Sequence, residues 1–293
     1  MVKKKSGSKN IKNAKAKFPL GIMLEILFLI VAIVGLGFLI VRSNKPADYI
    51  VETNAFFAPF EFYEGREIKG VDVDIINRVS EKMGKKIEIK DVEFDVIIDN
   101  VEAGKIADAG AAGLTITPAR SEKVNFSIPY YNSVQYIIFD KNAAPDIRDG
   151  HIVWNAVAGK KLGSQTGSTG YLYASDEIDA GVLKNTDTII KGFDSHQLAA
   201  DAIKAHIIDY AIADELPAKM IVSKNSELEA LPLYYMGATI ADDYPVEESY
   251  AIAVNKERTE LLEAFNEVLA EMLTKDPDGK SEIDRLVLKY MGF

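Results

Sequence analysis

Short apolar segments alternate with amphipathic segments along most of this chain, and this alternation restricts the fold more than any other feature. Residues 48–53 and 85–92 have the apolar, partly alternating pattern of strands. Residues 71–84 and 94–104 carry apolar side chains at helical spacing and end at glycines. Residues 106–113 are typical of a buried strand made of small residues. Strands and helices in this order predict an α/β fold.

The same local plan returns 101 residues further along the chain. Residues 102–113, EAGKIADAGAAG, align with residues 203–214, IKAHIIDYAIAD, as a helix end followed by a strand. We therefore expect two similar α/β lobes, with sites at the carboxyl ends of their strands. His206 lies at the second helix end, where we expect a left-handed turn rather than a ligand contact. Residues 54–70 are expected to form a loop.

An arginine lies where a helix start should disfavour one. In residues 113–121, GLTITPARS, Thr117 is a good N-cap and Pro118 suits the first helical position, which places Arg120 third. The helix dipole disfavours a cation there unless an anion binds beside it. A guanidinium and free N–H groups would then converge on one carboxylate. The alternative is a surface arginine paired with a nearby acid such as Glu122.

Two further segments could complete a site for a zwitterion. Residues 160–174 read as strand, glycine-rich turn and helix, with Ser168 and Thr169 at the helix start. This is either a second anion cradle or simply a tight turn, and it matches no nucleotide-binding motif. Asp214 ends an apolar strand, where it either caps the next helix or supplies a carboxylate to an ammonium group. A free α-amino acid carries both charges.

The composition narrows the function classes. The chain has 293 residues and no cysteine, which excludes disulfides, thiolate metal sites and cysteine nucleophiles. The net charge is −10 despite a lysine-rich N-terminus, and this acidic balance argues against nucleic-acid binding. Residues 276–284, DPDGKSEID, resemble a calcium loop, but Lys280 stands where an oxygen ligand belongs. We expect a polar turn there, and neither a metal nor a cofactor in the protein.

The N-terminal region predicts a membrane tether. Residues 1–18 form a basic tail with seven lysines and no acid. Residues 19–41 are apolar except for Glu25, and this run is long enough to span a bilayer as a helix. The flanking lysines place the tail in the cytoplasm and the rest of the chain, after a linker at 42–47, on the extracellular face of the cell membrane. A cleaved signal peptide is the alternative, but the long run and the poor cleavage site favour an uncleaved anchor.

Beyond the anchor, residues 48–293 resemble the bacterial extracellular solute-binding proteins of family 3, the polar amino-acid receptors of ABC importers. The resemblance rests on TNAFFAPFEF, KGVDVDI, VEFD, AGLTITPARSEKVNFSIPYY, GSQTGSTG, YAIADE and DGKSEIDRLVLKYMG. It implies a two-lobed, periplasmic-binding-protein-like α/β fold whose lobes are joined by two hinge strands and close around a ligand. The first lobe would comprise residues 48–134 and 246–293, and the second lobe residues 135–245.

The resemblance also implies the ligand-binding residues. They are Asn54, Phe57, Phe94, Gly113, Thr115, Arg120, Gln165, Ser168, Thr169 and Asp214. Arg120 would hold the ligand α-carboxylate, helped by Thr115 and by backbone around residues 168–169. Asp214 would take the α-ammonium group together with the backbone of Gly113.

The remaining implied residues surround the ligand side chain. Phe57 and Phe94 would sandwich it, and Gln165 would line the pocket from the second lobe. Asn54 departs from the family, which often has an aspartate in contact with a polar or cationic ligand end at this position. Because Asn54 has no charge, we expect a neutral polar ligand. The hinge crossings are expected near residues 132–136 and 241–249.

These features predict the extracellular substrate-binding component of an amino-acid ABC transporter. We expect a monomer without enzymatic activity that delivers its amino acid to a permease and its ATPase. One alternative is an enzyme on the same fold, such as a dehydratase of prephenate-like or arogenate-like acids, which would need a general acid or base in the cleft. Glu61 is the nearest candidate for that role. The other alternative is a tethered amino-acid sensor, against which the short N-terminal tail argues.

Overall fold

The structure is a computed structural model that describes residues 27–31 and 46–292 of the chain. The predicted tail lies outside the described residues, and the predicted membrane segment is described only over residues 27–31, which are helical. Across the described ranges, no helix combines the length and the apolar content that a membrane crossing requires. The part from residue 47 onward is a compact unit, and the following paragraphs concern that unit.

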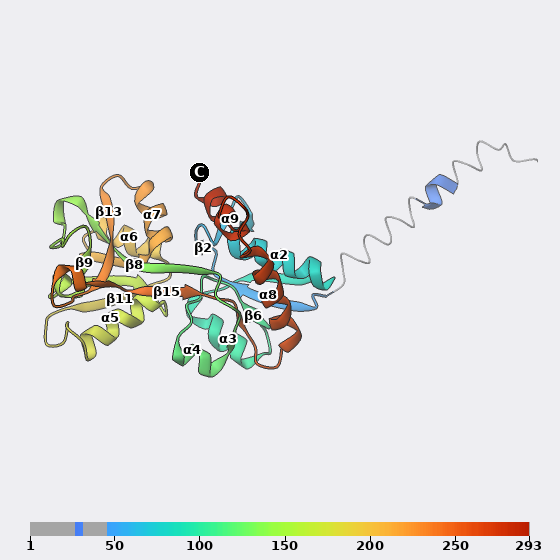
Figure 1. Cartoon of the computed structure of the whole chain (residues 1–293), viewed down its shortest axis with the longest axis horizontal. Coiled ribbons are helices and arrows are strands. Elements are labelled where there is room, and N and C mark those ends of the chain that lie inside the picture. The colour runs from blue at the N-terminus through green and yellow to red at the C-terminus, as the bar shows by residue number, and fades with distance from the viewer. Residues whose placement is uncertain (1–26, 32–45, 293) are drawn as a thin grey trace, which may run out of the picture. The chain divides into compact units, whose positions relative to one another are not determined.

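The first lobe is built on a five-stranded sheet with the order β5-β1-β6-β16-β7. Its strands are β1 (Tyr49–Thr53), β5 (Ile87–Asp91), β6 (Ala109–Gly110), β7 (Asn125–Phe126) and β16 (Ala253–Val254). β1 runs parallel to both β5 and β6, whereas β16 is antiparallel to β6 and β7. The C-terminal part of the chain therefore returns to complete the sheet that the N-terminal part begins (Figure 1).

Helices cover both faces of this sheet. The helical elements of the lobe are α2 (Val71–Met83), η1 (Phe94–Val96), α3 (Ile97–Ala103), α4 (Pro118–Lys123), α8 (Thr259–Met272) and α9 (Glu282–Met291). Apolar side chains of α2, α8 and α9 share one core with β1, and those of α3 form a separate core with Leu114 and Ala253. Gly84 ends α2, as its sequence position predicted, and adopts the left-handed conformation.

The segment predicted as a loop over residues 54–70 instead forms a small three-stranded sheet. Its strands are β2 (Phe56–Phe57), β3 (Glu61–Glu64) and β4 (Glu67–Lys69), in the order β2-β3-β4. Glu64 pairs with Glu67 around a two-residue turn in which Gly65 has φ 67°, the geometry of a hairpin with glycine first. The predicted strand at 106–113 is also shorter than expected, because only Ala109–Gly110 pair with both neighbours.

The second lobe contains an eight-stranded sheet with the central order β11-β10-β12-β8-β13-β14. Its strands are β8 (Tyr131–Asp140), β9 (Ile152–Val153), β10 (Lys161–Gln165), β11 (Ile189–Phe193), β12 (Tyr210–Asp214), β13 (Leu228–Tyr235), β14 (Tyr244–Pro245) and β15 (Glu247–Tyr250). Its helical elements are η2 (Lys141–Ala143), η3 (Trp154–Val157), α5 (Thr169–Asp179), α6 (His196–Lys204), α7 (Glu215–Ser223) and η4 (Ile240–Asp242). His206, just after α6, has φ 55°, which confirms the predicted left-handed turn.

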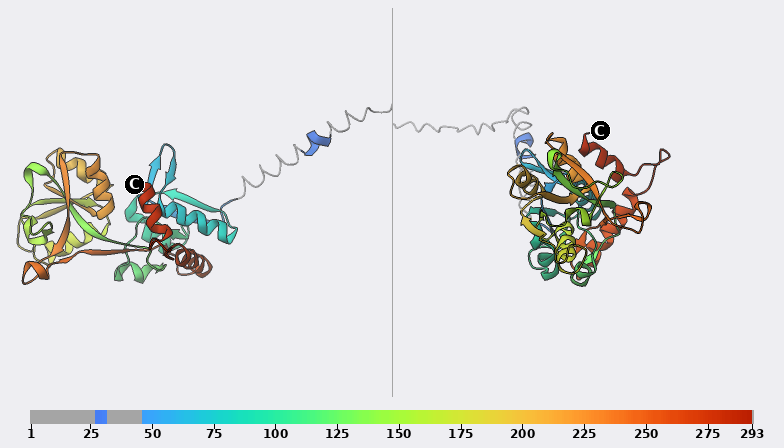
Figure 2. Two further views of the ribbon diagram at one scale, coloured as in Figure 1. Left: turned by 45° about the horizontal axis from the view of Figure 1, so that its top comes forward. Right: turned by 90° about the vertical axis from the view of Figure 1, so that its left-hand side faces the viewer.

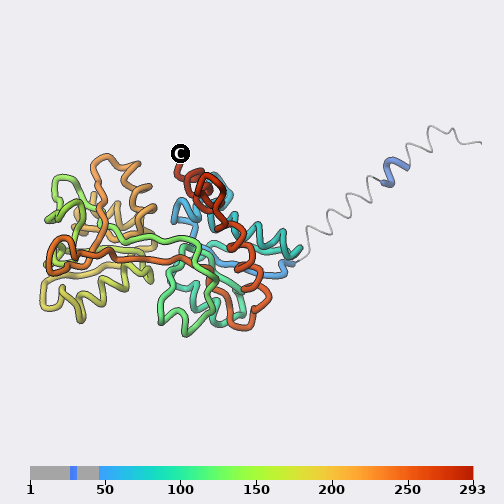
Figure 3. The backbone as a smooth tube through the Cα atoms, viewed as in Figure 1, coloured from blue at the N-terminus to red at the C-terminus, as the bar shows by residue number. Residues whose placement is uncertain are grey.

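Two antiparallel strands join the lobes. β15 pairs with the first part of β8, from Tyr131↔Tyr250 to Val134↔Glu247, and the rest of β8 lies between β12 and β13 in the second sheet. Figures 1 and 3 show both strands running side by side between the lobes, and the turned views in Figure 2 agree. The second crossing begins later than the predicted residue 241, because β14 still pairs with β13.

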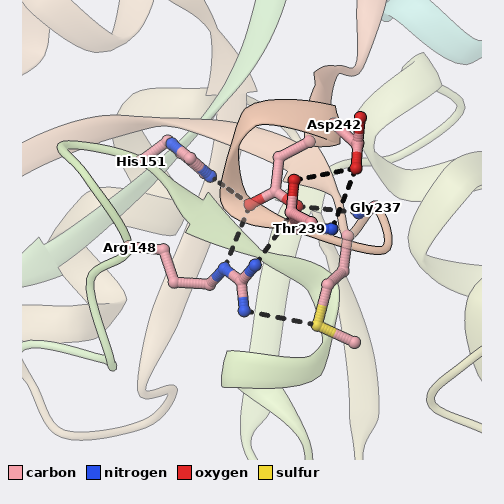
Figure 4. Close-up of polar contacts among 7 residues, drawn as sticks. Arg148, His151, Gly237, Thr239 and Asp242 are labelled. Atoms are coloured by element: carbon pink, nitrogen blue, oxygen red, sulfur yellow. Dashed lines mark hydrogen bonds and ion pairs between the residues drawn. The ribbon is translucent and has the colours of Figure 1, made fainter.

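A polar cluster at the far end of the second lobe ties two of its loops together (Figure 4). The carboxylate of Asp243 accepts hydrogen bonds from Arg148 Nε at 3.0 Å and from the backbone N–H of Gly237 at 2.7 Å. It also lies 2.8 Å from His151 Nε2. These contacts link the β8–β9 connection to the segment between β13 and β14. They therefore hold in place the chain that leads into β15.

Candidate ligand-binding cleft

A small cleft lies where the two lobes face each other. Its lining residues are Phe57, Phe94, Ala112, Gly113, Thr115, Arg120, Gln165, Ser168, Thr169, His196 and Asp214. This set contains every residue that sequence analysis proposed for the site except Asn54. A wider groove runs between Phe56, Tyr63 and Met220, but Lys224 is the one charged residue of its lining. The charges converge in the smaller cleft.

Arg120 lies at the third position of α4, as its sequence context predicted. Thr117 is the N-cap, and its hydroxyl accepts a hydrogen bond from the Arg120 backbone at 3.2 Å. The guanidinium donates from Nη1 to the Thr115 carbonyl at 2.9 Å and from Nη2 to the Gly167 carbonyl of the second lobe at 3.0 Å. It also lies 5.7 Å from the ring centre of Phe94. The guanidinium therefore spans the two lobes.

The charge of Arg120 is buried without an ion-pair partner in the described part of the chain. The residue is 8% exposed, and no carboxylate there lies within 4 Å of its guanidinium, so the pairing with Glu122 that the sequence allowed is not formed. Burial lowers the pKa of Arg120, whereas the charges of Glu248 and Asp214 raise it. Two of its five N–H donors are engaged in the hydrogen bonds to Thr115 and Gly167, so the guanidinium retains donors for an anion.

Asp214 ends β12 and occupies the N-cap position of α7, but its side chain makes no capping hydrogen bond. The carboxylate instead accepts from the Tyr250 hydroxyl and, at 2.8 Å, from Gln135 Nε2. Burial raises the pKa of Asp214, and the hydrogen bonds from Tyr250 and Gln135 oppose that rise. A carboxylate can accept about four hydrogen bonds, so Asp214 retains capacity for an ammonium group.

Glu248, a residue of hinge strand β15 that sequence analysis missed, lies beside the cleft. Its Oε2 accepts from the hydroxyls of Thr115 and, at 3.0 Å, of Thr169, and its Oε1 accepts from Gln135 Nε2 at 3.1 Å. Burial and the charge of Asp214 raise the pKa of Glu248 to about 8. The sequence shows that Glu248 lies two residues before Tyr250 in the predicted hinge region. The residues that bind it, Thr115, Gln135 and Thr169, lie far away along the chain.

The start of α5 differs in one respect from the predicted anion cradle. Ser168 caps the helix by accepting from the Tyr171 backbone at 3.3 Å, and its own N–H donates to the Gln165 carbonyl at 3.1 Å. The Ser168 N–H is therefore occupied by the tight turn, the alternative that the sequence left open. Thr169 is the first helical residue, where the backbone N–H has no partner within the helix.

Asn54 lies just outside the cleft lining, but it connects the lobes at one end of the cleft. Its Oδ1 accepts from Gln165 Nε2 at 2.8 Å, and its Nδ2 donates to the Val92 carbonyl at 2.7 Å. Gln165 also donates to the Asp194 carbonyl at 3.0 Å. This end of the cleft is therefore closed by two neutral amides.

Two buried rings of the cleft, Phe57 and His196, lie close to each other. Phe57 is buried and packs against Phe60 and Tyr250. It also packs against His196 of the second lobe, whose ring centre is 5.6 Å away. Burial lowers the pKa of His196 to about 4, so the ring is neutral at pH 7. Its Nδ1 lies 3.2 Å from the Ile212 carbonyl and must donate to it. His196 was not among the predicted site residues, because its position in the site depends on packing between the lobes.

Gly113 occupies a position at which any other residue would be strained. Its φ is 54°, and an added Cβ would lie 2.4 Å from a ring carbon of Phe57. Its N–H donates to Asp72 Oδ2 at 3.1 Å, and Asp72 also accepts from the Tyr130 hydroxyl at 2.6 Å. Burial raises the pKa of Asp72 to about 6. The peptide at Gly113 is thus held from behind by a buried acid.

We expect Gly113→Ala to destabilise the fold because it combines backbone strain with overlap onto Phe57. Strain costs about 1 kcal/mol and overpacking roughly 1–3 kcal/mol, so the melting temperature should fall by at least about 5 °C. Gly84→Ala is the matched control, since Gly84 has φ 60° but no atom within 4 Å of an added Cβ. Equal shifts in the two variants, measured by differential scanning calorimetry, would contradict the contact with Phe57.

The alternative of an enzyme loses its candidate acid. Glu61 is fully buried and is not part of the cleft lining. Burial, followed by the charge of Asp72, raises its pKa well above the usual range. At residues 276–284, Asp276 and Asp278 pair with Arg285 and Ser281 caps α9, which is the expected polar turn.

Comparison with known proteins agrees with this geometry. Residues 49–293 match the family described as bacterial extracellular solute-binding proteins, family 3. An arginine-binding extracellular protein of Bacillus subtilis is 28% identical over 244 residues, which are 82% of this chain and 85% of that protein. Relatives of this kind are named as binding proteins and not as enzymes.

Solved structures extend the agreement to the fold. An amino acid ABC transporter substrate-binding protein from Streptococcus pneumoniae bound to L-arginine has a TM-score of 0.69 and 25% identity, and covers 83% of this chain and 94% of its own. An ancestral arginine-binding protein bound to glutamine has a TM-score of 0.66 and 29% identity, covering 85% and 100%. The chain therefore belongs to the bacterial extracellular solute-binding proteins, family 3.

Proposed function

We propose that this protein binds a free α-amino acid between its two lobes and delivers it to the permease of an ABC importer. The observation that carries this proposal is the buried guanidinium of Arg120, which has no ion-pair partner among the described residues and lies in a cleft that also contains the carboxylate of Asp214. An α-carboxylate would satisfy the first group and an α-ammonium the second. The ligand would then stabilise the closed arrangement of the lobes by binding it better than the open one.

We propose that the ligand has a neutral polar side chain. Asn54 and Gln165 close one end of the cleft with amides rather than with a carboxylate. Gln165 retains its amide oxygen as an acceptor and Asn54 retains one N–H as a donor, which suits a side-chain amide or hydroxyl. Relatives named for arginine and an ancestral protein bound to glutamine show that cationic and neutral amino acids both occur among similar proteins.

A thermal-shift screen of the full-length chain against the twenty amino acids and cystine tests both statements. A ligand at about 100 times its Kd stabilises the folded state by about 2.7 kcal/mol, which raises the melting temperature by roughly 5–10 °C. We expect L-glutamine or another neutral polar amino acid to give the largest rise. No rise with any of them would contradict amino-acid binding, whereas a larger rise with L-arginine would contradict only the neutral side chain.

We further propose that the protein is a monomer tethered by residues 19–41, with residues 48–134 and 246–293 forming the first lobe and 135–245 the second. The apolar run and its flanking lysines support the tether. After cell fractionation, the full-length chain should remain with membranes in alkaline carbonate and be released by detergent. Release by carbonate alone would contradict a membrane-spanning tether.

A further inference from the structure

The buried carboxyl group of Glu248 connects both lobes through the cleft's own hydroxyl groups. Its Oε2 accepts from Thr115 of the first lobe and from Thr169 of the second. The side chain itself lies on hinge strand β15, and the residue is 2% exposed. Thr115 and Thr169 both line the cleft. Glu248 therefore controls two hydroxyls that face the proposed ligand.

Each threonine hydroxyl has a single proton to donate. When the Glu248 carboxylate is ionised, both protons point toward Oε2, and the hydroxyls present only lone pairs to the cleft. A ligand carboxylate is an acceptor without protons, so it would gain no hydrogen bond from either threonine. It would also be repelled by the ionised Glu248, because the ligand ammonium balances Asp214 and Arg120 supplies only one positive charge for the two remaining carboxylates.

A proton on Glu248 reverses this arrangement. Gln135 donates to Oε1, which leaves Oε2 as the oxygen that carries the proton. The new O–H then donates to one threonine hydroxyl, and that hydroxyl can turn its own proton toward the cleft. We propose that Glu248 is a positioning residue that holds a proton when the amino acid is bound and thereby directs one threonine hydroxyl to the ligand carboxylate.

The charged and titratable neighbours of Glu248 favour this protonation. Asp214 of β12 shares Gln135 with it and disfavours a second negative charge. Arg120 of α4 opposes protonation by its positive charge, while Tyr173 of α5 and Tyr250 of β15 are neutral at pH 7 because burial raises the pKa of each. Burial is the largest effect and raises the pKa of Glu248 to about 8, so near neutral pH the proton is already present.

The inference rests on the proposed function, and it predicts a pH dependence of binding that Glu248 controls. Isothermal titration calorimetry uses the full-length chain and the amino acid that gives the largest shift among the twenty. Wild-type affinity should fall about tenfold between pH 7 and pH 9, because ligand binding requires the proton that Glu248 loses in this range. Glu248→Gln, whose amide donates permanently, should show no such fall beyond the titration of the ligand itself.

A matched control separates Glu248 from its neighbours. Glu247→Gln removes an exposed carboxylate one residue away and should keep the wild-type pH profile. Since the ligand and Asp214 titrate in all three proteins, the difference between profiles reports Glu248. Parallel profiles for wild type and Glu248→Gln would overturn the inference while leaving amino-acid binding intact, whereas absence of binding by any amino acid would remove the proposed function and the inference with it.

A second measurement needs no variant and remains informative if Glu248→Gln does not fold. At pH 8 the wild-type protein should take up about half a proton per bound ligand, because the site is half protonated before binding and fully protonated afterwards. Titrations in two buffers with different ionisation enthalpies measure this uptake directly. Binding without proton uptake at pH 8 would overturn the proposed role of Glu248.

Discussion

Arg120→Ala is expected to abolish amino-acid binding while the protein remains folded. Truncating one partner of a buried, hydrogen-bonded charge pair costs about 2–5 kcal/mol, which corresponds to roughly a 30- to 4,000-fold loss of affinity. The loss should be at the upper end here, because the ligand carboxylate would lie in a cleft that also contains Asp214, without a counter-charge. The helix that carries Arg120 should persist, since Thr117 caps it through the backbone.

Calorimetric titration of the variant with the amino acid found in the screen measures this effect. Arg285→Ala is the matched control, because Arg285 is an exposed arginine that pairs with Asp276 and Asp278 and is not part of the cleft lining. It should bind like the wild type. Affinity retained within about threefold in Arg120→Ala, with an unchanged melting temperature, would refute the carboxylate role of Arg120.

The second large effect is expected for Asp214→Asn, which should weaken binding by at least about 30-fold. Asparagine keeps the shape of the side chain, and its oxygen can still accept from Tyr250 or Gln135, the partners of Asp214 in the hinge strands. The substitution removes only the negative charge that the ligand ammonium requires. The loss should therefore appear in affinity and not in the cooperativity of unfolding.

Two comparisons make this result specific. Asp201→Asn removes an aspartate from the same lobe that forms an exposed pair with Lys204, and it should leave affinity unchanged. A carboxylic acid that resembles the ligand but lacks its amino group should bind weakly to the wild type and no more weakly to Asp214→Asn. If Asp214→Asn instead weakened the deaminated acid as much as the amino acid, Asp214 would not be the ammonium partner.

Features that depend on neighbouring residues were predicted from the sequence. The helix that ends at Gly84, the N-cap at Thr117 and the placement of Asp214 at a strand end are all present in the structure. The left-handed turn at His206 belongs to the same group. Each follows from periodicity, capping chemistry or backbone sterics within a few residues, so one segment of the chain contains the necessary information.

Where the structure differs from the prediction, the reason lies in the local sequence in one case. In the other cases the local sequence contains no such signal. The hairpin around Gly65 was available from a glycine between two alternating runs, and the aromatic-rich segment was instead interpreted as a loop. The occupied N–H of Ser168 reflects a turn of two residues that no residue type forces. His196 lies in the cleft because packing of the second lobe places it against Phe57, which the local sequence does not predict.

The sequence by itself determined the α/β class, the resemblance to a two-lobed binding protein and most of the residues that line the cleft, because these depend on local pattern and ordered motifs. Only the tertiary structure decided what those residues touch. Thr115 and Glu248 are 133 positions apart, and Gln135 and Glu248 are 113 apart, yet burial places all three in one hydrogen-bonded group. Desolvation and long-range hydrogen bonds set the charges of such groups, and both exist only once the lobes and hinge strands have packed.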